Sequence, residues 1–432
     1  MKSGLGRLSL GVALWSIGTL PFLSRLFLGR TSRELDKYMV VMNAVLDGKR
    51  IYVDVPFEYP PYVLAWFAGP TMLAEDLGQF RLVFGGLILC LDALIKAALL
   101  WTGFRDRHRP PDALPFVMYT LATAALGHIL LQRYDLIPAV LSVAAVLALS
   151  SGSAGVAGLM VAVGVGTKVY PAVFVPVLAA VAWRRSPREA RQFAMGVGAG
   201  LLPLIALSWS MPWWRFANVH IHRGLEAESL WASALWLSHF AGVPATWELA
   251  SRWYEVTGPV ADRLIAPARV VWATATLGSV VLATWAAWRP KLSSGADADS
   301  MTLSVTATLV LLPVTTFVAF SLVLSPQFHL WLAPLAALAL FARRRPDAGV
   351  GTGALWCIFF STFLVPVFSP SPTFDVGLDL GRTFVLVFRN VLLLYATWSL
   401  LRTAVRLADR LPLPQDWRTD RLKSAARRDS QE

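Results

Sequence analysis

Charged residues are scarce in this chain of 432 residues, since Asp, Glu, Lys and Arg together make up 15% of it. A soluble domain carries about 25% charged residues. Apolar residues make up 56%, and the mean hydropathy is +0.55. The chain has too little polar surface to cover a fold in water, which excludes a cytosolic enzyme, a disordered protein and a secreted scaffold. The expected fold class is an all-α polytopic membrane protein.

Other features are missing too. No glycine-rich phosphate loop is followed by Lys and Ser or Thr, so neither a nucleotide-binding domain nor ATP-driven work is expected. The two cysteines, Cys90 and Cys357, lie in separate apolar runs and cannot supply a zinc-ligand set. The net charge of +12 does not indicate nucleic acid, because the basic residues lie in clusters between apolar runs. Glycines between 155 and 166 lie inside apolar runs, where small residues allow helices to pack closely.

Twelve apolar segments approach the length of about 20 residues that crosses a bilayer. They are 8–28, 79–102, 113–131, 136–150, 154–167, 169–183, 192–212, 268–288, 301–323, 328–342, 350–368 and 383–401. Basic residues are retained in the cytoplasm and so set the orientation. With a cytoplasmic N-terminus, twelve crossings place all the basic groups on the cytoplasmic side: Arg105 to Arg109, Arg184 to Arg191, Arg343 to Arg345, and Arg402 to Arg428.

The expected organisation is one transmembrane domain over residues 1–401 and a basic cytoplasmic tail over 402–432. The outer side then carries two large loops, 29–78 and 213–267, and several short polar turns. Residues 61–76 are apolar but short, so we expect them to lie in the outer interface. The alternative is a thirteenth crossing, which would place the first three basic groups outside.

The first outer loop should begin with a short amphipathic helix at the membrane surface. Thr31 and Glu34 fit a capping box. An apolar stripe follows at helical spacing, made of Leu35, Tyr38, Met39, Met42, Val45 and Leu46. Asp36 lies off this stripe, where a carboxylate suits a general base for a hydroxyl nucleophile. The alternative is a solvated acidic residue. Asp54 and Glu58 follow in the same loop.

Polar residues also lie where other predicted spans end on the outer side. Arg133 and Asp135 follow the third span, where a local pair is one interpretation. Lys168 joins the fifth and sixth spans and requires an anionic partner, either a phosphate or an internal carboxylate.

The second outer loop contains two His, one Arg and two Glu between 220 and 228. The spacing of His220 and His222 is a weak metal signal, and anion binding by His220 or Arg223 is the stronger expectation. Gln327 and His329 follow a proline at outer membrane depth, where polar side chains usually face a cavity. A helix-packing hydrogen bond is the alternative.

Together these segments resemble the GT-C superfamily of integral-membrane glycosyltransferases, and within it glycosyltransferase family 87. The matching segments run in order over residues 31–331. They are Asp36-x-Tyr38, Gly48 to Asp54, Phe57 to Pro61, Arg133-Tyr134-Asp135, Lys168 to Pro171, His222 to Trp231, and Ser325-Pro326-Gln327. Mannosyltransferases of the family often carry Trp-x-His-His after the Ser-Pro. Here that stretch contains His329 alone, which leaves the donor sugar open.

The resemblance implies transfer of a sugar, with mannose expected, from a polyprenyl-phosphate donor to a hydroxyl of a glycolipid or cell-envelope glycan. The reaction would take place at the outer face of a bacterial cytoplasmic membrane, with inversion and without a cofactor, divalent metal, nucleic acid or ATP. Asp36 would be the general base. The donor phosphate would contact Lys168, Arg223, His220, Arg133 and His329. The acceptor or sugar would contact Asp54, Glu58, Tyr59, Glu228 and Gln327.

A transporter or flippase of a lipid-linked glycan is the alternative function. It would place ionisable residues near the bilayer midplane, often within inverted repeats. Asp92 and Lys96 stand out inside an apolar span, but their spacing of four residues predicts that they pair with each other. We find no internal repeat. A non-catalytic assembly protein is a third possibility, against which the density of polar residues from 220 to 229 argues.

Overall fold

A computed structural model describes most of the chain, and 81% of it is helical. The described residues are 2–28, 33–106, 110–221, 223–243, 245–250, 253–289, 296–344, 352–367 and 380–409. His222 and the tail beyond 409 lie outside these ranges, whereas residues 402–409 continue the last helix.

Every one of the twelve predicted apolar segments falls on helical structure. In chain order the helices are α1 (Lys2–Leu28), α4 (Leu77–Phe104), α5 (Leu114–Leu126) with α6 (His128–Gln132), α7 (Leu136–Ser150), α8 (Ala154–Thr167), η1 (Tyr170–Phe174) with α9 (Val175–Arg185), α10 (Pro187–Leu207), α13 (Pro259–Trp288), α14 (Ala296–Phe320), α15 (His329–Ala339) with η4 (Leu340–Arg344), α16 (Gly353–Leu364) with η6 (Val365–Val367), and α17 (Leu380–Asp409).

Six of the described helices are long and apolar enough to cross a membrane individually: α1, α4, α10, α13, α14 and α17. Others are shorter, such as α7 with 15 residues and α8 with 14. The chain is therefore an α-helical polytopic membrane protein, and the number of twelve crossings stays a prediction.

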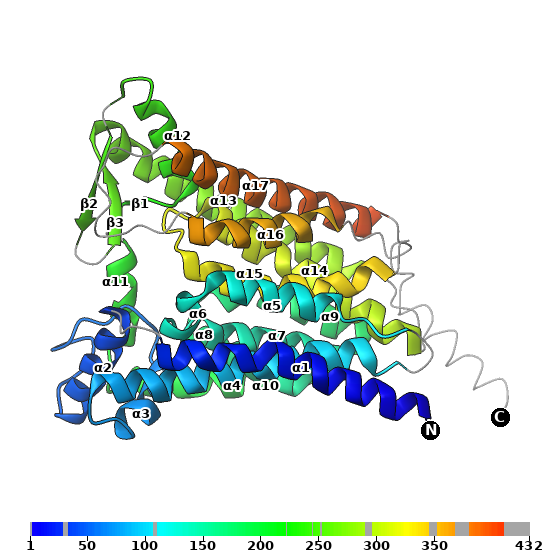
Figure 1. Cartoon of the computed structure of the whole chain (residues 1–432). Helices are drawn as coiled ribbons and strands as arrows, with labels where there is room; N and C mark the ends of the chain where they lie inside the picture. Colours follow the sequence, from blue (N-terminus) through cyan, green and yellow to red (C-terminus); the bar gives the residue numbers. More distant parts are fainter. Residues whose placement is uncertain are drawn as a thin grey trace, which may run out of the picture.

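The two ends of the bundle differ in what they carry. The start of α1 and the end of α17 lie at one end, which we call the terminal end (Figure 1). Arginines mark this end, among them Arg105 at the end of α4 and Arg184 and Arg185 in the last turn of α9. The opposite end, the loop end, carries α2 (Arg33–Leu46), α3 (Val63–Met72) and α11 (Phe216–Ile221). The ten residues of α3 are too few to cross a bilayer on their own.

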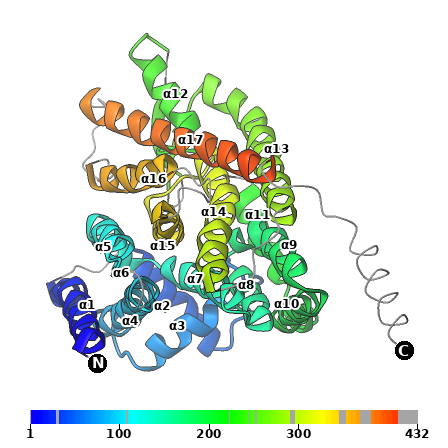
Figure 2. The ribbon, with the colours of Figure 1, turned by 90° about the vertical axis from the view of Figure 1, so that its right-hand side faces the viewer.

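The centre of the bundle is formed by α14 and α15, with the other helices around them (Figure 2). All eleven residues of α15 are buried, as expected for a helix that is apolar on every side. The outer helices instead expose large apolar side chains, such as Leu202 of α10 and Phe388 of α17. In a membrane protein these exposed apolar faces contact lipid.

Glycines bring α8 and α10 into close contact, as the sequence predicted. A Cβ on Gly158 would lie 2.1 Å from the backbone oxygen of Phe193. A Cβ on Gly196 would lie 2.0 Å from the oxygen of Gly155. No side chain fits at these positions without separating the two helices.

The first helix is held in the bundle by polar contacts. Lys96 Nζ donates to Asp92 Oδ2 at 2.5 Å, which confirms the predicted pair, and also to the oxygen of Gly18 in α1 at 2.7 Å. Arg25 of α1 donates to the oxygen of Ala124 at 3.0 Å. These contacts make α1 an integral part of the bundle.

The second outer loop contains a small sheet, which the all-α expectation did not include. Strands β1 (Leu225–Glu226), β3 (Trp253–Thr257) and β2 (Thr246–Ala250) pair antiparallel in that order. The aromatic and β-branched residues of β2 and β3 favour strand structure. A short helix, α12 (Leu230–His239), separates β1 from the other two strands.

Candidate active site

Four ion pairs gather at the loop end. Each joins a cation to a carboxylate: Lys37 to Glu58, Arg133 to Glu34, Lys168 to Asp135, and Arg223 to Glu226. Four aromatic side chains, Tyr38, Tyr59, Tyr134 and Trp331, lie among them. We call these twelve residues the loop-end cluster. Because each cation already has a carboxylate partner, the eight charged side chains sum to zero.

Lys168 lies between α8 and η1 and is the cation most enclosed by aromatic rings. Its Nζ donates to Asp135 Oδ1 at 2.6 Å, and its side chain is 16% exposed. The ring centres of Tyr134 and Trp331 lie 4.7 and 5.0 Å from the ammonium. Lys168 thus pairs with an internal carboxylate in this structure, and its contact with a donor phosphate stays a prediction.

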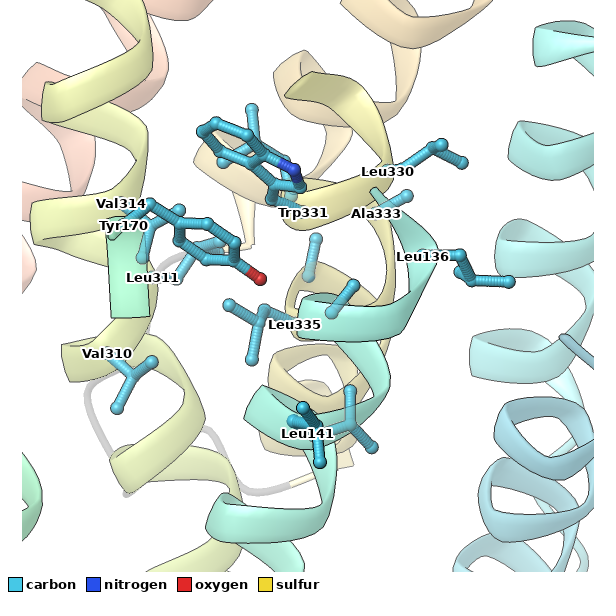
Figure 3. Close-up of a cluster of buried hydrophobic side chains, with 14 of the residues drawn as sticks. Leu136, Leu141, Tyr170, Val310, Leu311, Val314, Leu330, Trp331, Ala333 and Leu335 are labelled. Carbon is cyan, nitrogen blue, oxygen red and sulfur yellow. The ribbon is translucent and has the colours of Figure 1, made fainter. Parts of the chain in front are cut away.

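Asp135 connects this ion pair to the core. Its Oδ1 also accepts a hydrogen bond from Trp331 Nε1 at 2.9 Å. The indole of Trp331 stacks on Tyr170, with ring centres 4.2 Å apart, and apolar side chains surround the two rings (Figure 3). The phenol of Tyr170 is fixed by Ser142 at 3.0 Å. The anchor of Lys168 is therefore rigid.

The two acidic residues of α2 lie on different faces of that helix. Glu34 Oε2 lies 2.9 Å from Arg133 NH1, and the two side chains are 18% and 28% exposed. Asp36 comes two residues later, which places it on the opposite side of the helix, where it is exposed. The predicted base Asp36 therefore lies outside the loop-end cluster, and its catalytic role stays a prediction. The capping role predicted for Glu34 involves Thr31, which is outside the described residues.

Glu58 and His220 join the first outer loop to the second. Burial alone would raise the pKa of Glu58, but the adjacent Lys37 ammonium holds it below the ordinary carboxyl value. His220 Nε2 donates to the backbone oxygen of Glu58 at 3.0 Å, since a carbonyl only accepts. Burial lowers the pKa of His220, so the imidazole is neutral at pH 7. His220 therefore acts here as a hydrogen-bond donor without a charge.

Arg223 and Glu226 connect the second outer loop to the turn before α15. Arg223 NH2 lies 3.5 Å from Glu226 Oε2, and Glu226 Oε1 accepts from Ser325 Oγ at 2.6 Å. Gln327 follows in η3 (Pro326–Phe328) and is half-buried. Ser325 thus contacts the cluster, and the predicted role of Gln327 in binding the acceptor or sugar stays a prediction.

Two predicted site residues belong to a separate buried network. Glu228 pairs with Arg389 of α17, whose NH2 also donates to the Glu228 backbone oxygen at 2.7 Å. Burial raises the pKa of Glu228 to about 7, although Arg389 acts in the opposite direction. His329 is fully buried nearby, and its Nδ1 lies 3.0 Å from Thr362 Oγ1. This network fixes the second outer loop on the bundle, and the carboxylate of Glu226 in the loop-end cluster acts on Glu228 electrostatically.

Asp54 lies apart from both groups. It forms an exposed pair with Arg50, whose NH2 lies 3.1 Å from Asp54 Oδ1 and whose backbone N–H donates to Oδ2 at 2.9 Å, and these hydrogen bonds lower the pKa of Asp54. Within the described ranges no three His, Cys, Asp or Glu side chains lie close enough to hold a metal ion. Whether a divalent ion takes part stays a prediction.

The sequence matches the family model of glycosyltransferase family 87 over residues 57–326, which is more than half of the chain. The chain belongs to glycosyltransferase family 87. It is therefore a glycosyltransferase, and the match is consistent with a GT-C-type membrane enzyme, as the motifs indicated. The match includes Glu58, Arg133, Lys168 and Arg223 of this family 87 enzyme, whereas α2 precedes it and His329 follows it. No curated protein sequence matches the chain.

Sequence reasoning missed several members of the loop-end cluster as site residues: Glu34, Lys37, Tyr38, Tyr134, Asp135, Glu226 and Trp331. A signal was present for some of them. Tyr134 and Asp135 lie in the Arg-Tyr-Asp motif, and Tyr38 in the Asp-x-Tyr motif. Nothing local in the sequence distinguishes Lys37, which pairs with a residue 21 positions away.

Proposed function

We propose that the protein transfers a sugar, with mannose expected, from a polyprenyl-phosphate donor to a hydroxyl of a glycolipid or cell-envelope glycan. The observation that supports this most is the position of the loop-end cluster. It joins ionisable groups to aromatic rings at the end of an apolar bundle, where a lipid-linked phosphate would meet water. Family membership supports glycosyl transfer over the transporter alternative.

The chemistry requires two kinds of group. The acceptor oxygen attacks the anomeric carbon, the bond from that carbon to the phosphate oxygen breaks, and the acceptor proton passes to a base. Cations such as Lys168 and Arg133 would stabilise the charge that develops on the leaving phosphate. Since Asp135 and Glu34 already neutralise these cations, the phosphate would share them with the carboxylates.

We assign the general base to a carboxylate of α2. Glu34 is the one that lies in the cluster, where its Oε2 is buried against Arg133 and its side chain as a whole is 18% exposed. Asp36, which the resemblance implied, lies on the exposed face of the same helix. The geometry therefore favours Glu34, and Asp36 is its alternative.

The positive-inside rule supports an outward-facing site. The arginines of the terminal end would face the cytoplasm together with both termini, and the loop end would face outward. The protein would then reside in the bacterial cytoplasmic membrane and receive its donor from the lipid phase.

The test is transfer from radiolabelled polyprenyl-phosphate-mannose to a total lipid extract, with chelator and without nucleotide sugar. We expect label transfer with purified wild type and with Asp36→Asn, and a loss of about 100-fold or more with Glu34→Gln, the range for removal of a general base. The two variants are matched, because both exchange a carboxylate for an amide on α2. Loss with Asp36→Asn alone would assign the base to Asp36. Absence of transfer with wild type would refute this donor.

A further inference from the structure

Two buried phenols of the loop-end cluster have no hydrogen-bond partner. Tyr38 and Tyr134 are both 0% exposed, and neither hydroxyl oxygen is bonded to any group in the described part of the chain. The great majority of buried polar side-chain atoms in proteins are hydrogen-bonded, because an unpaired one costs free energy. Two such hydroxyls in one place indicate that a polar group completes them.

The rings that carry these hydroxyls are held in place. Tyr38 and Tyr134 meet edge to face with ring centres 5.9 Å apart, and Tyr59 lies 4.7 Å from Tyr134. Phe67 stacks on Tyr38 with ring centres 4.2 Å apart and also meets Tyr134 edge to face at 5.8 Å. The phenols are therefore fixed in position before a ligand binds.

The charges nearby decide what kind of ligand fits. The pKa of Tyr38 is raised mainly by burial and then by the carboxylate of Glu34, while the Arg133 guanidinium acts in the opposite direction and Asp135 and Glu58 add smaller increases. The phenol stays protonated and can donate. The charged side chains around it are paired and sum to zero, so they favour no net anion, whereas a neutral hydroxyl can both donate to and accept from a phenol. A group rich in neutral hydroxyls, such as a sugar ring, is the matching ligand.

We propose that the hydroxyls of Tyr38 and Tyr134 form the subsite that holds the hydroxyl groups of the transferred sugar, an inference that rests on the function proposed above. The ring of Tyr134 lies 4.7 Å from the ammonium of Lys168. The sugar is bonded directly to the donor phosphate, so a phosphate at Lys168 places the sugar beside Tyr134. Glu34 and Arg133 act electrostatically on Tyr38, and their side chains are 18% and 28% exposed.

The experiment measures kcat/KM for polyprenyl-phosphate donors that carry mannose or its 2-, 3-, 4- or 6-deoxy analogue. The enzymes are wild type, Tyr38→Phe, Tyr134→Phe and the control Tyr119→Phe. Tyr119 is the control, because it too is a tyrosine with 0% exposure, but its hydroxyl lies outside the loop-end cluster, beside the Asp92 carboxylate inside the bundle. A site that hydrogen-bonds a substrate hydroxyl rejects the analogue that lacks it.

We expect wild type to use at least one deoxy donor about tenfold less well than the full donor, which is the value of one hydrogen bond of about 1.4 kcal/mol. Tyr38→Phe or Tyr134→Phe should lose about the same factor on the full donor and no longer distinguish it from that deoxy donor. Tyr119→Phe should keep the wild-type preference. The thermal midpoints of Tyr38→Phe and Tyr134→Phe should equal or exceed that of wild type, because each change removes a buried hydroxyl that has no partner.

Three results would overturn the proposal. Equal use of all five donors by wild type would do so without any variant. Retention of the wild-type preference by both Tyr38→Phe and Tyr134→Phe would refute the subsite and leave the proposed function intact. No transfer by wild type from any donor would refute the proposed function and this inference with it.

Discussion

The ion pair between Lys168 and Asp135 allows a structural role to be separated from a catalytic one. We expect Lys168→Met to destabilise the protein, because it leaves the carboxylate of Asp135 buried with Trp331 Nε1 as its partner. Asp135 is 1% exposed, so solvent does not replace the lost ammonium.

The magnitude follows from the burial of both partners. Removal of one partner from a buried pair costs about 3–5 kcal/mol. Because the Lys168 side chain is 16% exposed, we expect a loss of about 3 kcal/mol, at the lower end of this range. Asp135→Asn keeps an oxygen that accepts from Trp331. The double variant Lys168→Met with Asp135→Asn should therefore lie within about 1 kcal/mol of wild type, because no unpaired charge remains.

Two assays compare wild type, Lys168→Met, Asp135→Asn and the double variant: one measures unfolding and the other measures activity. The free energy of unfolding comes from denaturant titration in detergent, and activity is transfer from the polyprenyl-phosphate donor. If Lys168 also contacts the donor phosphate, the double variant should regain stability but not activity, with KM for the donor raised about tenfold or more.

Two results would refute the reasoning. Equal stability of Lys168→Met and wild type would show that the ion pair does not form in the folded protein. Recovery of donor use in the double variant would show that Lys168 serves only to neutralise Asp135. In that case the phosphate would have to be held by other cations.

Three further predictions concern packing, pH and topology. Gly196→Ala should lower stability by about 1–3 kcal/mol, because the added methyl group overpacks the contact with α8. Gly198→Ala on the same helix has open space around it and should be neutral or stabilising. Thermal unfolding of both variants measures the difference. Burial raises the pKa of Glu228 from 4.5 to about 7, so its contribution to stability is full below pH 4.5 and is lost as the pH rises through about 7. Glu228→Gln should remove this part of the pH dependence of the thermal midpoint, and an unchanged profile would contradict the assignment. Pro187→Cys, in a background with both native cysteines replaced by alanine, should react with a membrane-impermeant thiol reagent only from the cytoplasm; labelling from outside would contradict the orientation.

The helices of the bundle were predictable because their signal is local. Each predicted apolar segment overlaps described helical structure, and the segments 136–150 and 154–167 agree with α7 and α8 residue for residue. The apolar stripe of α2 was also correct in its first half, where Leu35, Tyr38 and Met42 are buried. Leu46 at its end is exposed, because the helix stops there and the chain turns away.

The small sheet was missed because its strands are short and lie far apart. β1 has two residues, and it pairs with β3 across α12 and the loop that follows. The alternation typical of a half-buried strand needs about four residues or more to be recognised. The register of Glu226 against Glu255 depends on the tertiary fold.

For the candidate site, the sequence could predict that a charged side chain has a partner but not which residue that partner is. A charged side chain at membrane depth requires a partner, so the sequence correctly predicted that Lys168 would have an anionic one. It could not determine which, because the partner lies 33 residues away on another helix. Glu34 and Arg133 are separated by 99 positions and meet only after α2 packs against the bundle. Spacing along one helix identified the pair of Asp92 and Lys96, where both partners lie on one face. Where the partners come from different parts of the chain, the sequence predicts that a partner exists, and only the fold determines which residue it is. The choice between Glu34 and Asp36 as general base has the same limit, because it depends on which face of α2 packs against the bundle.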